Sequence, residues 1–150
     1  MNCNNFRQPV ITAIDPFALN IFLAMKETII LVREFDEKLT CIAQLYLPGI
    51  KFGEYEIDGR SLIIATSETV YILNPWEFKI VQSFKIMGKI SSLKVGNGII
   101  LVSFSHNQGK FIQILTPTAE KPLNYTFQLE DIKNHTAITA DAQFLVIVTH

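Results

Sequence analysis

Three histidines are the first residues in this sequence that could act as general bases or metal ligands: His106, His135 and His150. Catalysis by such a group needs a nucleophile, a paired carboxylate or further ligands beside it. His106 lies in the stretch SHNQGK, which is typical of a solvated turn. His135 opens a segment that recurs through the chain, and His150 is the last residue. We therefore expect no catalytic histidine.

Three acidic residues, Glu34, Asp36 and Glu37, lie close together in VREFDEKLT and could bind calcium. Their spacing matches no EF-hand loop, and the stretch lacks the glycine of the sharp turn. A solvated loop is the better interpretation. The glycines of GNG at residues 96–98 are not a phosphate-binding motif, because no predicted helix follows them. They predict a hairpin turn.

The two cysteines, Cys3 and Cys41, are too few for a disulfide framework or a four-ligand metal site. Cys41 lies in TCIAQLYL, where we expect a small buried hydrophobic residue. No other combination of residues suggests a reactive centre. The sequence thus predicts no metal, no cofactor and no enzymatic activity.

Positive charge gathers in one part of a chain whose net charge is −1. Residues 78–119 contain no acidic residue and five lysines: Lys79, Lys85, Lys89, Lys94 and Lys110. The lysines alternate with apolar residues, as do solvent-facing side chains that protect the edges of sheets. The alternative is that they bind an anionic partner.

The only tryptophan, Trp76, follows the turn signal Asn74-Pro75 in NPWEFK. It either packs over its own sheet or is exposed as a binding anchor, a role in which tryptophan is enriched. The candidate partner-binding residues are therefore Trp76, Lys79, Lys85, Lys89 and Lys94.

Two similar segments indicate how these residues are positioned. LAMKETIIL begins at Leu23, and IATSETVYI begins at Ile64. Related segments give four units that start at residues 11, 52, 90 and 135. A fixed period of about 40 residues indicates a repeat protein. No window has the long apolar stripe of a helix, which excludes the TPR, ankyrin and HEAT repeats.

Each unit contains four short segments rich in β-branched and aromatic residues, separated by turn-forming residues. Four antiparallel strands in about 40 residues are typical of one blade of a β-propeller. We expect an all-β fold with one partial β-propeller domain over residues 1–150. Its blade units are 11–51, 52–89, 90–134 and a truncated unit at 135–150.

In the first unit, strands are predicted at residues 11–14, 20–25, 28–33 and 40–46, with helix content close to nil. The repeat also aligns three small residues on the second strands: Ala24, Ala65 and Ser103. We expect all three to be buried where neighbouring blades face each other.

The fourth unit, NHTAITADAQFLVIV, resembles the WD40-type β-propeller family. His135 falls at the position of the family's Gly-His histidine, and Asp141 falls at its turn aspartate. VYILN is similar to the end of the family's third strand, with Leu73 in place of Trp and Asn74 in place of Asp. No Trp-Asp or Gly-His pair occurs. The resemblance implies a divergent member of a family of propeller scaffolds.

Three and a half blades cannot close a ring, since closed propellers have four or more. We expect this chain to be completed by further blades, by a companion chain or by its own copy.

Nearly half of its residues are hydrophobic, yet no run approaches the roughly 20 apolar residues of a membrane helix. The first ten residues also lack the apolar core of a secretory signal. An intracellular location follows, cytoplasmic or nuclear.

These features favour a non-catalytic scaffold for protein–protein interaction within a larger assembly, a step that rests on analogy with the fold. The alternative is a peripheral membrane module that binds phosphoinositides through the basic segment 78–119. The phosphoinositide-binding propellers of autophagy carry an Arg-Arg pair, whereas this chain has no arginine after Arg60. A net charge near zero argues against a broad nucleic-acid surface.

Overall fold

The computed structural model describes residues 11–14, 20–25, 27–35, 38–55, 61–129, 135–138 and 145–148. Over these residues the chain forms fourteen β-strands and no helix. The described part of the chain accordingly has no helix that is long and apolar enough to cross a membrane. The expected all-β class and negligible helix content are confirmed.

Three sheets have four antiparallel strands each, in sequence order from one edge to the other. Blade 1 contains β1 (Ile11–Ile14), β2 (Asn20–Ala24), β3 (Thr28–Phe35) and β4 (Lys38–Tyr46). Blade 2 contains β5 (Phe52–Tyr55), β6 (Leu62–Ala65), β7 (Thr69–Asn74) and β8 (Lys79–Lys85). Blade 3 contains β9 (Lys89–Gly96), β10 (Ile99–His106), β11 (Gly109–Leu115) and β12 (Asn124–Leu129).

A fourth sheet pairs β13 (His135–Ile138) with β14 (Leu145–Val148). The strands predicted for the first unit are confirmed, although β3 and β4 extend two residues further at their shared hairpin end. The GNG stretch forms the predicted hairpin turn between β9 and β10. There Asn97 and Gly98 have φ values of 48° and 81°, the left-handed conformation that such tight turns require.

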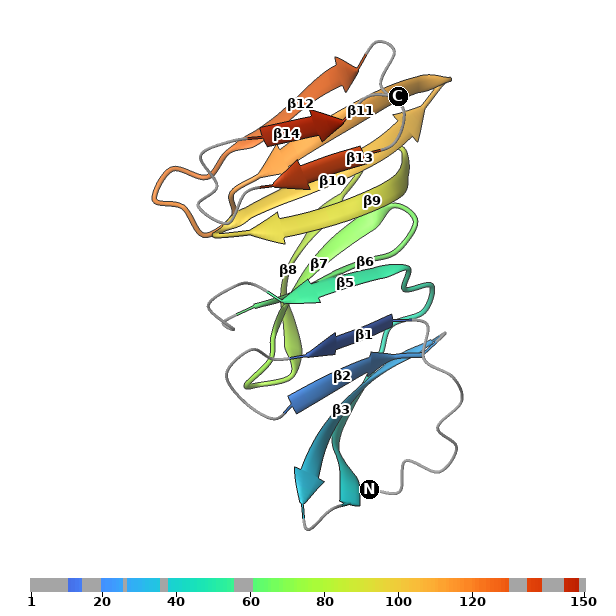
Figure 1. Cartoon of the computed structure of the whole chain (residues 1–150), viewed down its shortest axis with the longest axis vertical. Coiled ribbons are helices and arrows are strands. Elements are labelled where there is room, and N and C mark those ends of the chain that lie inside the picture. Colours follow the sequence, from blue (N-terminus) through green and yellow to red (C-terminus); the bar gives the residue numbers. More distant parts are fainter. Residues whose placement is uncertain are drawn as a thin grey trace.

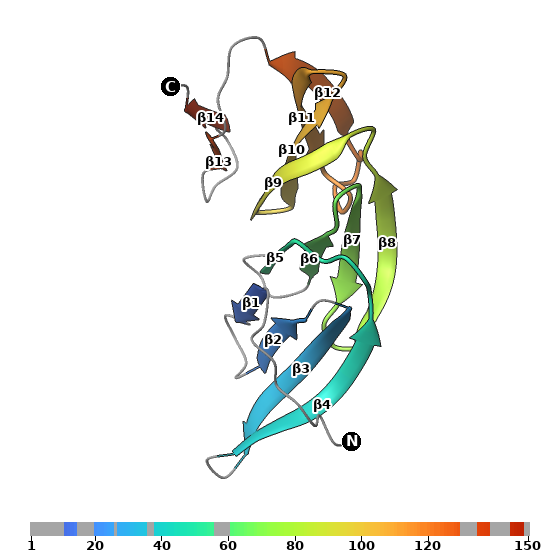
Figure 2. The ribbon, with the colours of Figure 1, turned by 90° about the vertical axis from the view of Figure 1, so that its right-hand side faces the viewer.

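The sheets follow one another along an open arc (Figures 1 and 2). In Figure 2, β1, β5, β9 and β13 lie on the inner side of the arc, and β4, β8 and β12 lie on the outer side. The inner strands of successive blades are neighbours, β1 beside β5, β5 beside β9 and β9 beside β13. This is the arrangement of part of a β-propeller.

Two apolar cores lie between the blades. The first packs residues of blade 1 against residues of blade 2: Phe22, Ala24, Ile29, Leu31, Leu47, Ile50, Leu62, Ile64 and Leu73. The second packs blade 2 against blade 3 and includes Ile63, Ala65, Val70, Ile72, Ile90, Leu93, Ile100, Val102 and Phe104. Alternate residues of β6 belong to different cores, because successive side chains of a strand point to opposite faces. Blade 2 is therefore apolar on both faces.

The prediction for the small residues is confirmed at two positions and wrong at the third. Ala24 and Ala65 are buried in the two cores, but Ser103 is only half-buried. The correct alignment of blades 2 and 3 follows from their two-residue turns. In blade 2 the turn is Ser67-Glu68, closed by the hydrogen bond from Thr66 N to Thr69 O. In blade 3 it is Asn107-Gln108, closed by the pairing of His106 with Gly109. The counterpart of Ala65 is thus Ser105, which is exposed.

The sequence alignment matched β9 of blade 3 with β5 of blade 2. A β-bulge in β9 explains why that match does not carry over to the second strands, β10 and β6. Ser103 lies opposite Ser92, but Phe104 lies opposite Ile90, so Ser91 is an extra residue in β9. The Ser91 hydroxyl donates a hydrogen bond to the Ser103 carbonyl (3.2 Å). An inserted residue of this kind shifts the pairing beyond it.

Cys41 is half-buried on β4 and its sulfur is disulfide-bonded, so the predicted role of a small buried hydrophobic residue is wrong. Cys3 lies outside the described residues. The same holds for Asp36, Glu37 and Asp141, and for the side chains of Glu34 and His135.

Candidate protein-interaction site

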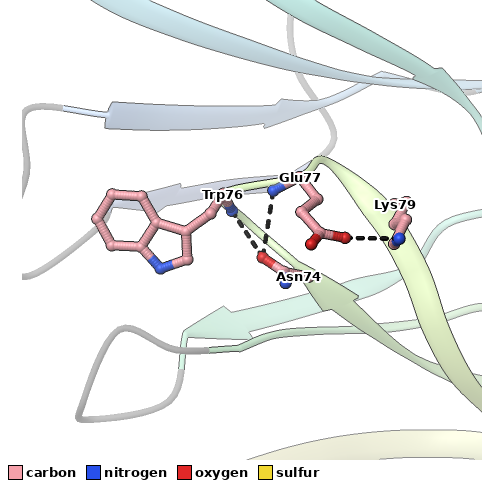
Figure 3. Close-up of polar contacts among 4 residues, drawn as sticks. All are labelled: Asn74, Trp76, Glu77 and Lys79. Atoms are coloured by element: carbon pink, nitrogen blue, oxygen red, sulfur yellow. Dashed lines mark hydrogen bonds and ion pairs between the residues drawn. The ribbon is translucent and has the colours of Figure 1, made fainter.

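The loop between β7 and β8 is built on Asn74. Its side-chain oxygen accepts hydrogen bonds from the backbone N–H groups of Trp76 (2.9 Å) and Glu77 (3.2 Å) (Figure 3). An asparagine that follows a strand commonly closes a turn in this way. Pro75 is buried within the turn, and its ring fixes one backbone angle. The contacts that shape this loop therefore come from within the loop itself.

Trp76 is presented by this loop and is 70% exposed. Of the two interpretations left open by the sequence, the structure supports exposure, because the ring is not packed over its own blade. Figure 3 shows the indole directed away from Glu77 and Lys79. A large, rigid aromatic side chain on a fixed loop is suited to anchoring a partner, since little conformational freedom is lost on binding.

Phe78 fixes the other end of the loop. Its φ is 51°, a left-handed conformation that is uncommon for residues other than glycine. Its ring stacks on Phe22 of blade 1, with centroids 5.9 Å apart and planes inclined by 23°. Aromatic packing of this kind offsets the cost of the backbone conformation. The loop of blade 2 thus rests on blade 1.

The candidate lysines do not form one patch. Lys79 lies opposite Asn74 at the loop end of β8, while Lys85 lies opposite Thr69 at the other end, roughly 20 Å away for a seven-residue strand. Lys89 lies near Lys85, across the short connection from β8 to β9. The structure therefore brings Trp76 close to Lys79 alone among the candidate lysines.

Two of these lysines have acidic partners. The Lys79 ammonium lies 2.6 Å from Glu77 in the same loop (Figure 3). The Lys94 ammonium lies 3.7 Å from Glu54 on β5. Both pairs are substantially exposed, and such pairs contribute little to stability. Their effect is to lower the net positive charge that the basic segment presents.

The described residues contain no group of three or more His, Cys, Asp or Glu side chains that could hold a metal ion. His106 is exposed, but it is the last residue of β10 and lies beside the turn, not within it. One of its ring nitrogens lies 3.0 Å from the Asn107 amide.

Sequence reasoning did not identify Glu54, Phe22 or Phe78 as functional or structural contacts. Each acts across two blades and is separated from its partner by about 40 residues or more. The repeat period was the only sequence signal for these contacts, because residues one period apart lie on neighbouring blades.

No protein-family model matches this sequence. No curated protein matches it either. Similarity appears among solved structures. The chain resembles the β-propeller domain of Myceliophteria thermophila Cps50 (Swd1), with a TM-score of 0.74, 12% identity, and coverage of 99% of this chain and 51% of that one.

Two further structures show the same likeness. Saccharomyces cerevisiae Sqt1 has a TM-score of 0.63 at 10% identity, covering 79% of this chain and 35% of its own. Kuenenia stuttgartiensis hydrazine synthase has a TM-score of 0.72 at 9% identity, covering 89% of this chain and 41% of its own. The chain thus spans about a third to a half of the length of these structures.

Identities this low concern the fold alone, and a fold shared with an enzyme does not decide between catalysis and binding. The four-stranded blades, the adjacent inner strands and these likenesses agree on one architecture. Over the described residues, the chain has the fold of part of a β-propeller.

Proposed function

We propose that this protein is a non-catalytic interaction module, in which the exposed Trp76 loop of blade 2 anchors a protein partner within a larger assembly. The observation that carries the proposal is a 70% exposed tryptophan on a loop fixed by Asn74 at one end and by Phe78 stacked on Phe22 at the other. Exposed aromatic anchors of this kind supply much of the affinity in protein interfaces.

Site-specific photo-crosslinking in cells tests the proposal. A photo-reactive phenylalanine analogue placed at residue 76 is expected to capture one or a few proteins in stoichiometric yield. The matched control carries the analogue at Tyr46, which is 69% exposed on β4. Captured proteins should be specific to position 76, and Trp76→Ala should abolish their co-purification. The same spectrum of proteins at both positions would contradict an anchor at Trp76.

The alternative, a phosphoinositide-binding surface on residues 78–119, receives less support from the arrangement of charges. Lys79 and Lys94 face acidic partners, and Lys79 and Lys85 lie at opposite ends of β8. Flotation with phosphoinositide vesicles at low salt decides the matter. Binding that is lost in a Lys85→Ala, Lys89→Ala double variant would establish the lipid function in place of the protein one.

We propose an intracellular location, as expected from the sequence. The disulfide at Cys41 points the other way, since disulfides persist mainly in oxidising compartments. Cell fractionation, combined with thiol labelling of the protein in intact cells, tests the location directly.

A further inference from the structure

A methionine is exposed on the connection from β8 to β9, where blades 2 and 3 meet. Met87 is 79% exposed, although methionine is among the residue types that are most often buried. Ile86 before it and Ile90 after it are 2% and 3% exposed and belong to the core between the two blades. Both blades have four strands, so Met87 is exposed beside an interface that is already packed.

The backbone that carries Met87 is tied to both blades. The Ile86 N–H donates a hydrogen bond to the Glu68 carbonyl oxygen in the turn between β6 and β7 (2.7 Å). Gly88 lies so close to β10 that an added Cβ would be 2.3 Å from the Ser105 carbonyl oxygen. A segment that is anchored before binding loses less conformational freedom when a partner covers it.

The corresponding connection between blades 1 and 2 shows which of these features the fold requires. There Leu47 is buried, and its N–H donates a hydrogen bond to the turn between β2 and β3 (2.9 Å), as that of Ile86 does to the turn between β6 and β7. The exposed residue that follows is Pro48 in that connection and Met87 in this one. Because the same contact forms beside a proline, the packing of the blades does not require a methionine here. Met87 is therefore available for binding.

Two lysines flank the methionine. Lys85 and Lys89 lie two residues before and two residues after Met87, and both are exposed. Unlike Lys79 and Lys94, they form no ion pair within the described part of the chain. This pattern is complementary to a partner in which an apolar side chain lies between carboxylates. Methionine suits such a contact, since its flexible, polarizable side chain adapts to the shape of a partner.

One acidic residue lies close by, because the connection is hydrogen-bonded to Glu68. The Glu68 side chain is exposed, and in the described structure no ion pair joins it to Lys85 or Lys89. It supplies one negative charge against two positive charges. The surface therefore keeps a net positive charge.

A short peptide fits this surface better than a membrane does. Recognition of anionic lipids by charge takes clusters of about four to eight Lys or Arg residues, whereas the stretch KIMGK at residues 85–89 supplies two. The Cα atoms of Lys85 and Lys89 are at most about 14 Å apart, a distance that an extended peptide of about five residues spans.

We propose that residues 85–89 bind a short acidic segment of another protein. An apolar side chain of that segment packs on Met87, and carboxylates on both sides of it pair with Lys85 and Lys89. Lys85 lies at the end of β8 opposite to the Trp76 loop. The two surfaces are therefore separate, and the proposal does not rest on the function proposed for that loop.

Defined peptides test this surface. The probes are fluorescent peptides of about seven residues, long enough to reach both lysines, with a central Leu, Ile, Phe or Trp and glutamates on both sides. Their anisotropy is followed while the whole 150-residue chain is added. We expect saturable binding of at least one acidic peptide that weakens as salt is raised. Peptides with lysine in place of glutamate should not bind.

Variants of the chain locate the binding. The affinity should fall about tenfold or more with Lys85→Glu and Lys89→Glu together, and about threefold or more with Met87→Ser, while Met87→Leu should retain it. Lys51→Glu is the matched control, because Lys51 is an exposed lysine on the connection between blades 1 and 2. Neither this change nor Trp76→Ala should alter the affinity.

The proposal is overturned if no acidic peptide binds saturably, or if Lys51→Glu weakens binding as much as the double variant does. Flotation with phosphatidylserine vesicles supplies a further outcome. If the chain binds such vesicles through Lys85 and Lys89 but binds none of the peptides, the surface belongs to a membrane and the proposal is wrong.

Discussion

The Glu54 carboxylate on β5 accepts a hydrogen bond from the backbone N–H of Val95 on β9, with 2.9 Å between Oε2 and nitrogen. Its other oxygen lies 3.7 Å from the Lys94 ammonium. β5 and β9 are the inner strands of neighbouring blades, and each is an edge of its own sheet. One side chain thus satisfies an edge N–H and connects two blades.

Glu54→Ala should lower the free energy of unfolding by about 1–3 kcal/mol, because the half-buried Val95 N–H loses its charged acceptor. Glu54→Gln keeps an acceptor oxygen and should cost less. Urea denaturation of the three proteins measures the order. Lys94→Ala should change stability by less than about 0.5 kcal/mol, since that pair is exposed. A larger loss with Lys94→Ala than with Glu54→Ala would assign the contact to the ion pair instead.

Ala65→Leu should destabilise the protein by about 1–3 kcal/mol, because Ala65 is fully buried in the core between blades 2 and 3 and extra methyl groups overpack it. Thermal unfolding followed by circular dichroism measures the change. The same substitution at exposed Ala119 is the control and should be nearly neutral. Equal unfolding temperatures for the two variants would show that the interface has room.

Gly88→Ala should also destabilise the fold, since a Cβ at this position would lie 2.3 Å from the Ser105 carbonyl oxygen and 2.6 Å from the Phe104 ring. The carbonyl belongs to a strand and cannot move aside cheaply, so a cost of about 1–3 kcal/mol is expected. Met87→Ala, a change at a 79% exposed neighbour, should leave the urea midpoint unchanged. An unaltered midpoint for Gly88→Ala would mean that the connection between blades 2 and 3 shifts freely.

Asn74→Ala should loosen the Trp76 loop, because it removes the acceptor of two backbone hydrogen bonds at a cost of about 1 kcal/mol. Trp76 is the only tryptophan, so its fluorescence anisotropy reports this loop alone and should fall. Asn74→Asp keeps the acceptor and should preserve the anisotropy. If both variants behave like the parent protein, Phe78 alone is sufficient to hold the loop.

The blade pattern could be predicted from the sequence because its signals are local. Alternating apolar residues and turn-forming pairs such as Asn97-Gly98 act over a few positions, and the repeat multiplies them. The alignment of Ser103 with Ala65 failed because the bulge at Ser91 and the longer hairpin of blade 3 leave no distinct mark in the sequence. Strand pairing, not residue spacing, sets that alignment.

The candidate site could be predicted only in part. The sequence indicated Trp76 but not its exposure, which depends on whether the loop folds back over the blade. The deciding contact, Phe78 on Phe22, joins residues on different blades. The candidate lysines lie within one acid-free segment of the sequence, yet the seven-residue length of β8 places Lys79 and Lys85 at opposite ends of that strand.

The stack of Phe78 on Phe22 has a thermodynamic consequence. It makes the shape of a blade 2 loop depend on the position of blade 1. The affinity of a partner for Trp76 is therefore linked to the free energy that holds the two blades together. A partner that binds only the stacked loop raises the work needed to separate the blades. By reciprocity, separating the two blades lowers the binding free energy of that partner by the same amount. Binding at the Trp76 loop and resistance of blades 1 and 2 to separation therefore increase or decrease together.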